Sequence, residues 1–215
     1  MNRHSLDKIE ELINRYPEMI NNKTEIMKAT DCIIDAYKNG NKIMCCGNGG
    51  SAADSLHIVG ELMKAFVRKR KVSHGWKEKL SACEDSEYII ANLQMALPAI
   101  SLVSEVGLLT AYANDVAPDM NFAQQVFGQG KKGDILFAIS TSGNSKNVLY
   151  AAEVARAMGI TVIGLTGESG GDLKSLVDVL INVPQKETFK IQELHLPVYH
   201  AICLAVEEEF YHDDL

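Results

Sequence analysis

The sequence predicts an α/β fold, in which a parallel β-sheet is covered by helices on both faces. Short apolar segments of strand length alternate along the chain with stretches of helical periodicity. Segments that are apolar throughout are typical of parallel strands buried on both faces of a sheet. The predicted strands are residues 42–46, 99–103, 135–139, 161–165 and 177–183.

Helical spacing of apolar residues begins near the N-terminus and extends over residues 5–38. Pro17 is expected to divide this stretch into two helices, and Gly40 to end the second. No repeat or Pro/Gly-rich linker interrupts the chain, so we expect a single domain over residues 1–215 with N-terminal helices in 1–40. The other predicted helices are 51–66, 84–97, 104–113, 118–129, 145–158 and 188–211.

The composition restricts the class of protein. With 215 residues, of which 47% are hydrophobic and 23% charged, the chain is of the soluble globular type. Its net charge of -7, without a large basic block, argues against direct binding to nucleic acid or to a membrane. The five cysteines include no C-x-x-C pair, which favours reduced thiols over a zinc ribbon or a disulfide framework. We therefore expect a cytoplasmic protein.

The loop Ser140-Thr141-Ser142-Gly143-Asn144-Ser145 is the strongest candidate for a binding site. It follows a predicted strand and opens a predicted helix, and four of its six residues carry hydroxyls. A helix N-terminus offers free N–H groups and the positive end of the helix dipole, which suit a phosphate. The pattern G-x-x-x-x-G-K is absent, which argues against a nucleoside triphosphatase. The alternative is an ordinary N-cap, although a cap needs only one hydroxyl.

A second loop, Cys46-Gly47-Asn48-Gly49-Gly50-Ser51, follows the first predicted strand. Its glycines would let a ligand approach the backbone closely. It lacks the third glycine of a dinucleotide-binding loop, so no nucleotide cofactor is expected. The alternative is a plain turn from strand to helix. Ligands of open parallel sheets bind at the carboxyl ends of the strands, where both loops are expected.

Two helices carry candidate acid–base groups. His57 and Glu61 lie four residues apart and therefore share one helix face. The last predicted helix supplies a second polar group. A carboxylate that faces an imidazole can move a proton between adjacent carbons, and the same donors could ligate a divalent metal. Besides proton transfer and metal binding, each of these residues could instead have a purely structural role. The second polar group consists of Gln192, Glu193, His195 and His200.

The run Arg68-Lys69-Arg70-Lys71 is the only basic cluster of note. The simplest expectation is a solvated helix end and turn. The alternative is a set of positive charges that attracts a phosphate to the rim of the site.

Three segments together resemble the sugar isomerase (SIS) domain family and, within it, the phosphoheptose isomerase subgroup: CGNGGSAADSLHIVGEL, AISTSGNSKNVLYAAEVARAMGITVIGLTG and KIQELHLPVYHAICLAVEEEF. The resemblance covers about residues 5–66 and 99–212. It implies a flavodoxin-like three-layer sandwich with a five-stranded parallel sheet, the SIS fold, preceded by an N-terminal helical extension. It also implies a homotetramer with active sites between subunits.

The resemblance also implies roles for individual residues. Ser140, Thr141, Ser142 and Ser145 would hold the phosphate, and Asn48, Gly49, Gly50, Ser51 and Gln192 would bind the sugar. Glu61 would be the general base and His200 the general acid. Zinc is implied as a candidate cofactor, with the ligands His57, Glu61, Gln192 and His200.

The activity implied is that of an intramolecular oxidoreductase. It would convert sedoheptulose 7-phosphate to D-glycero-D-manno-heptose 7-phosphate through an enediol, in heptose biosynthesis. One alternative is a non-catalytic SIS protein that binds the replication initiator. Another is an isomerase or sensor for a different sugar phosphate.

The chain departs from the family pattern in several places. Ala65 stands where the family often has an arginine, and Leu102 and Phe189 stand where it usually has acidic residues. Residues 67–98 form an insertion relative to the family. The phosphate-binding residues and the acid–base pair are kept, so the departures concern the sugar end of the site.

Overall fold

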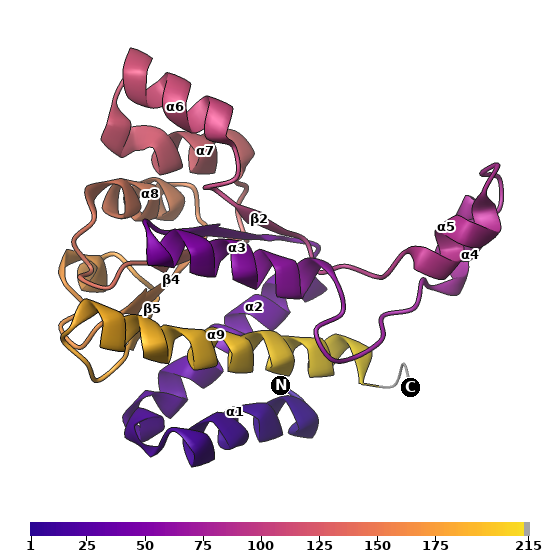
Figure 1. The fold of residues 1–215 in the computed structure, drawn as a ribbon, viewed down its shortest axis with the longest axis horizontal. Helices are drawn as coiled ribbons and strands as arrows, with labels where there is room; N and C mark the ends of the chain where they lie inside the picture. The colour runs from indigo at the N-terminus through magenta and orange to yellow at the C-terminus, as the bar shows by residue number, and fades with distance from the viewer. Residues whose placement is uncertain (213–215) are drawn as a thin grey trace.

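The computed structural model describes residues 1–212, in which five parallel strands form one sheet of order β2-β1-β3-β4-β5 (Figure 1). The predicted fold class is confirmed. Each strand lies within one residue of its prediction, except at the end of the second and the start of the fifth. The strands are β1 (Ile43–Cys46), β2 (Ala99–Ser101), β3 (Ile135–Ile139), β4 (Thr161–Thr166) and β5 (Val179–Asn182).

Both faces of the sheet are buried, because successive side chains of a strand point to opposite faces. In β1, Ile43 and Cys45 join the core on one face, and Met44 and Cys46 join the core on the other. All five cysteines, which lie in the described part of the chain, are free thiols.

The helices form the outer layers of the sandwich (Figure 1). Helices α2, α3 and α9 pack on one face of the sheet, with α1 against α9, and helices α7 and α8 cover the other face. None of the helices in the described residues is long and apolar enough to cross a membrane. The helices are α1 (Arg3–Arg15), α2 (Lys23–Lys38), α3 (Gly50–Met63), α4 (His74–Leu80), α5 (Ser86–Asn92), α6 (Val106–Asp115), α7 (Asn121–Gln129), α8 (Lys146–Ala157) and α9 (Thr188–Tyr211), with 3-10 turns at Pro17–Asn22, Pro118–Met120 and Asp172–Ser175.

The N-terminal helices follow the sequence prediction. Helix α1 ends at Arg15, and Pro17 opens a 3-10 turn that leads into α2. Proline cannot donate the backbone hydrogen bond that would continue the first helix, but it fits the first position of the turn. Gly40 follows α2 with a φ of 71°, a conformation that suits glycine.

Residues 67–98, which we call the arm, extend away from the body of the molecule (Figure 1). The predicted helix over 84–97 is wrong at its end: α5 stops at Asn92, and the chain returns in an extended conformation. Gln94 pairs with Lys71 in an isolated antiparallel bridge, and the amide of Met95 donates to the carbonyl of Arg70 at 2.9 Å. These non-local hydrogen bonds outweigh the helical preference of residues 93–97.

Candidate active site

The two glycine-containing loops lie side by side at the carboxyl edge of the sheet, because β1 and β3 are paired in parallel. Asn48 in the first loop and Asn147 in the first turn of α8 hold the loops together. Each amide donates to the other's carbonyl oxygen, at 2.9 and 3.0 Å. The sequence interpretation missed Asn147, although its position two residues after Ser145 placed it at the loop.

The loop of residues 140–145, which we call the phosphate-loop candidate, is shaped by hydrogen bonds of its own hydroxyls. Ser140 Oγ lies 3.1 Å from Ser145 Oγ and accepts from the amide of Gly143 at 3.2 Å. Ser142 Oγ accepts from the amide of Asn144 at 3.1 Å. Ser145 is the N-cap residue of α8, but its side chain makes no capping hydrogen bond. The Ser145 side chain therefore does not cap the helix, and the N–H groups at the helix N-terminus can face a ligand.

A neighbouring loop supports this one from the β4 side. The amides of Gly167 and Leu173 donate to the carbonyls of Thr141 and Gly143, at 3.0 and 2.9 Å. Gly143 has a φ of 68°, and a Cβ there would lie 2.0 Å from the carbonyl oxygen of Gly170. Glycine is required at this position by both conformation and space.

A hollow of about 320 Å³ opens beside the phosphate-loop candidate. It provides polar side chains from three loops, and two of them, Lys186 and Glu168, form an ion pair at 3.4 Å. The lining residues are Thr141, Ser142, Asn144, Gly167, Glu168, Ser169, Gln185, Lys186 and Ile191.

The first loop leads directly into α3. Gly49 has a φ of 56°, and Ser51 is buried in the first turn of the helix. A Cβ on Gly50 would lie 2.3 Å from Nε2 of Gln192, so the Gln192 amide rests on the backbone at the start of α3. The predicted sugar-binding residues Asn48, Gly50 and Gln192 thus lie together beside the phosphate-loop candidate.

The predicted acid–base groups meet between α3 and α9. His57 Nε2 lies 3.2 Å from Glu61 Oε1 and 3.4 Å from His200 Nε2. Lys64 donates to the other carboxylate oxygen of Glu61 at 2.8 Å. Burial, reinforced by neighbouring His57, lowers the pKa of His200, whereas Glu61 opposes this shift. His200 is therefore largely neutral at pH 7.

Two residues that the sequence interpretation missed orient His57. The buried Tyr199 hydroxyl lies 3.0 Å from His57 Nδ1 and donates to Asp54 Oδ1 at 3.2 Å. Because its single hydrogen goes to Asp54, the hydroxyl accepts from Nδ1–H of His57. Nε2 of His57 is then the nitrogen that faces Glu61 and His200. Burial raises the pKa of Asp54, against the lowering effect of the bond from Tyr199.

The predicted zinc ligands do not all come together. His57, Glu61 and His200 are donors that suit zinc, but Gln192 lies against Gly50, about two helical turns from His200 on α9. Glu61 is also paired with Lys64. Within residues 1–212, no group of three or more His, Cys, Asp or Glu side chains is arranged to hold a metal ion. Zinc binding at these residues therefore stays a prediction of the family resemblance, and the proposed reaction steps assign roles only to the side chains of the chain itself.

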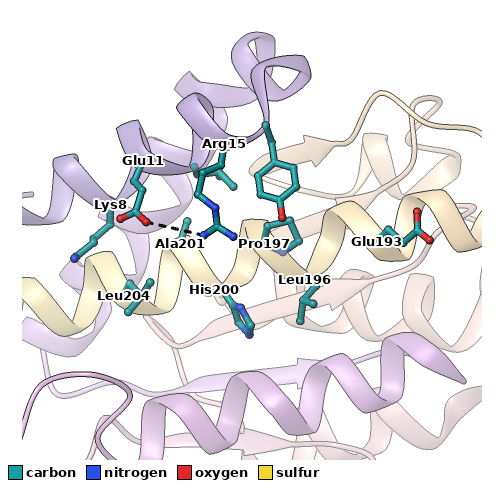
Figure 2. Close-up of a pocket in the computed structure, with 11 residues that line it drawn as sticks. Lys8, Glu11, Arg15, Glu193, Leu196, Pro197, His200, Ala201 and Leu204 are labelled. Atoms are coloured by element: carbon teal, nitrogen blue, oxygen red, sulfur yellow. Dashed lines mark ion pairs between the residues drawn. The ribbon is translucent and has the colours of Figure 1, made fainter.

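Figure 2 shows a hollow of about 140 Å³ between α1 and α9, on the far side of α9 from α3. Arg15 and Glu11 from α1 line it, together with Glu193 from α9. His200 borders the hollow, but its ring points away from α1 (Figure 2), toward His57. The acid–base chemistry therefore lies on the α3 side of α9, outside this hollow.

The polar group predicted on the last helix is divided by the structure. His200 faces α3, Gln192 faces the start of α3, Glu193 is exposed, and His195 is fully buried. With about 3.6 residues per helical turn, Glu193 and His200, which are seven residues apart, lie on nearly the same side of α9, whereas His195 points into the core. The prediction that they form one group is therefore wrong for His195, which is buried.

His195 gives a testable pH dependence. Burial lowers its pKa to about 4, and the backbone of Thr166 opposes this only in part. In the unfolded chain the ordinary value is about 6.5, so between pH 6.5 and 4 the unfolded state binds more protons. The free energy of unfolding should therefore fall as the pH drops, by about 2 kcal/mol from pH 7 to pH 5. Urea unfolding at both values measures this, and His195→Gln should remove this part of the difference; an unchanged pH dependence would contradict it.

The departures from the family pattern occupy different environments. Leu102 is fully buried behind β2, where its carbonyl accepts from the buried amide of Gln125. Phe189 is 56% exposed at the start of α9. The amide of Ala65 donates to Oε1 of Gln94 in the arm at 2.7 Å. Leu102 is thus a core residue, and Phe189 is available to contact a ligand or another chain.

Comparison with known proteins identifies the class to which this fold and site belong. The family model described as SIS domain matches residues 6–76 and 89–167. The gap between the matched segments lies in the arm.

Similar proteins narrow the class further. Phosphoheptose isomerases of Helicobacter hepaticus and of a Nitratiruptor species are 41% and 42% identical over 86% of this chain, and over 82% and 86% of their own lengths. The solved phosphoheptose isomerase of Neisseria gonorrhoeae has a TM-score of 0.68 and 33% identity, with 93% of this chain and 98% of that chain covered. The chain therefore belongs to the SIS domain family and, within it, to the phosphoheptose isomerases, which are enzymes.

Proposed function

We propose that this chain isomerises sedoheptulose 7-phosphate to D-glycero-D-manno-heptose 7-phosphate. The observation that carries the proposal is the contact between the acid–base groups, with His57 Nε2 at 3.2 Å from Glu61 and 3.4 Å from His200. The phosphate-loop candidate at the edge of the same sheet provides an anchor for the phosphate. The comparisons lend no support to the two alternatives, which are binding of the replication initiator, and isomerisation or sensing of a different sugar phosphate.

The reaction moves one hydrogen from C1 to C2 and one from O1 to O2. Glu61, as a carboxylate, takes a proton from C1 of the open-chain ketose, and the electrons of the C–H bond form a C1=C2 bond. The electrons of the C2 carbonyl move to O2, which takes up a proton, and the product of this step is an enediol. O1 then loses its proton, C1=O forms, and the proton held by Glu61 returns to C2.

His200 serves the two oxygens in this proposal. A neutral imidazole has one nitrogen that donates and one that accepts, so it can deliver a proton to O2 and collect one from O1. The lowered pKa of His200 keeps it in this neutral form. His57, oriented by Tyr199, lies between the two catalytic groups, at 3.2 Å from Glu61 and 3.4 Å from His200.

Turnover of sedoheptulose 7-phosphate, followed by NMR, tests the proposal. The matched control substrate is unphosphorylated sedoheptulose, which should react far more slowly because it lacks the phosphate anchor. Zinc remains a prediction of the family resemblance, so the assay is run after treatment with a chelator and again with added zinc. Absence of turnover under both conditions would contradict the proposed activity.

We further propose a homotetramer, as the resemblance implies. Helix α6 lies wholly within the described residues, and none of its side chains is fully buried. Apolar side chains on α3, α6, α7 and α9 are exposed in the single chain, which is typical of surfaces covered by other subunits. They are Leu56, Met63, Val106, Leu108, Phe127, Phe189 and Leu196. Light scattering after size-exclusion chromatography measures the mass, and a monomer would contradict the assembly.

A further inference from the structure

Arg70 is a fully buried side chain in a run that the sequence predicts to be solvated. The expectation that this run is exposed to solvent is therefore wrong for Arg70. Its guanidinium donates to the carbonyl oxygens of Leu62 and Glu61, at 2.5 and 3.1 Å, and to the carboxylate of Glu207 at 2.9 Å. These three hydrogen bonds come from three different nitrogens of the planar guanidinium. A lysine has a single nitrogen and cannot make the same set of bonds.

The two carbonyls belong to the last turn of α3. Helix ends leave their final carbonyl groups without partners inside the helix. Helix α3 ends at Met63, and its C-cap residue Lys64 is extended and not a glycine. Arg70 satisfies the backbone of Glu61 itself, so it fixes the helical turn that carries the proposed base.

Glu207 connects the same arginine to α9. Its carboxylate also accepts from the amides of Phe66, Val67 and Arg68, at 2.8 to 3.0 Å. The chain after α3 therefore wraps around this one buried carboxylate. Glu207 lies seven residues, or about two turns, after His200, so both face α3 from the same side of α9.

We infer that Arg70 is a positioning residue that, through Glu207, sets the placement of Glu61 on α3 relative to His200 on α9. The inference rests on the proposed function, because it concerns the base and acid of that reaction. Arg70 touches neither carboxylate oxygen of Glu61 and acts only through the backbone. The distance between two groups on two helices is thereby fixed by one ion pair that bridges the helices.

The arm is joined to the same point. The carbonyl of Arg70 accepts from the amide of Met95, and the carbonyl of Leu62 accepts from the amide of Leu97 at 3.0 Å. Both ends of the arm thus meet at the end of α3. Displacement of the arm would act on the turn that carries Glu61 through these bonds.

Arg70→Lys and the double variant Arg70→Met/Glu207→Gln test the inference. The double variant removes the buried ion pair, while the amide oxygen of the glutamine still offers an acceptor to the backbone amides that Glu207 binds. In both variants we expect kcat to fall by about 100-fold, the effect of a small misplacement of catalytic groups. KM should change little, because the phosphate-loop candidate at the carboxyl edge is untouched. Circular dichroism and thermal unfolding report whether each variant is folded.

The matched control is Arg68→Met, in the same segment of the chain. The Arg68 side chain is partly exposed and pairs with Glu208 on α9 at 3.0 Å, instead of with the carbonyls at the end of α3. We expect its kcat to stay close to that of the wild type.

The outcomes separate this inference from the proposed function. No turnover by the wild type would overturn the proposed function, and the inference with it. Turnover by the wild type, together with a folded double variant of unchanged kcat, would overturn the inference alone, since Arg70 would then serve only the fold. A loss of kcat in Arg68→Met equal to that in Arg70→Lys would also overturn it.

Discussion

Replacement of Glu61 by Gln should lower kcat by about 10³-fold or more, because the variant lacks the general base for the C1 proton. The amide keeps the size of the side chain and its contacts with Lys64 and His57 at 2.8 and 3.2 Å, although the charge is lost. Binding of the sugar phosphate should change far less than kcat, because Glu61 makes its main contribution in the transition state. Steady-state kinetics with sedoheptulose 7-phosphate measures both quantities.

Glu78→Gln is the control for this experiment. Glu78 is an exposed carboxylate in the arm, paired with His74 at 3.4 Å. Its replacement removes the same charge at a distance from α3 and α9 and should leave kcat unchanged. Activity of Glu61→Gln within tenfold of the wild type would contradict the assignment of the base.

Replacement of Gly143 by Ala should disrupt the phosphate-loop candidate. The new Cβ would lie 2.0 Å from the carbonyl oxygen of Gly170, and the residue would have to keep a φ of 68°. Because the obstacle is backbone, the loop itself must shift. We expect KM for the sugar phosphate to rise by at least tenfold. Inorganic phosphate should inhibit the variant much more weakly than it inhibits the wild type.

Gly128→Ala is the matched control. Gly128 lies in α7, and a Cβ there would have no atom within 4 Å. This change should leave KM as it is and stabilise the fold slightly, by up to about 1 kcal/mol, since alanine favours a helix over glycine. If Gly143→Ala binds phosphate like the wild type, the assignment of the loop is wrong.

The sequence predicts the sheet because its strands are apolar on both faces, a pattern that depends only on local residues. The helix ends predicted at Pro17 and Gly40 are confirmed for the same reason, since each residue restricts or frees its own backbone. The arm could not be predicted in this way. Its return over residues 93–97 is set by hydrogen bonds to Arg70 and Leu62, which come from distant parts of the chain.

The same distinction applies to the site. The contact between His57 and Glu61 follows from their four-residue spacing, and the loop at Ser140 follows from its hydroxyls. The orientation of His57 by Tyr199, and the burial of Arg70 against Glu207, depend on how α3 packs against α9. Tyr199 stands among apolar residues and Arg70 among solvated bases, so neither carried a local signal of its role.

The central claim is that Glu61 and His200 catalyse an enediol isomerisation of a sugar phosphate. The most direct measurement is an NMR spectrum of sedoheptulose 7-phosphate incubated with the protein in D₂O. The account predicts that the aldose signals appear, with deuterium at C2 wherever the proton on Glu61 exchanges with solvent before it returns, in the wild type but not in Glu61→Gln. An unchanged spectrum with the wild type, or equal conversion by Glu61→Gln, would contradict it.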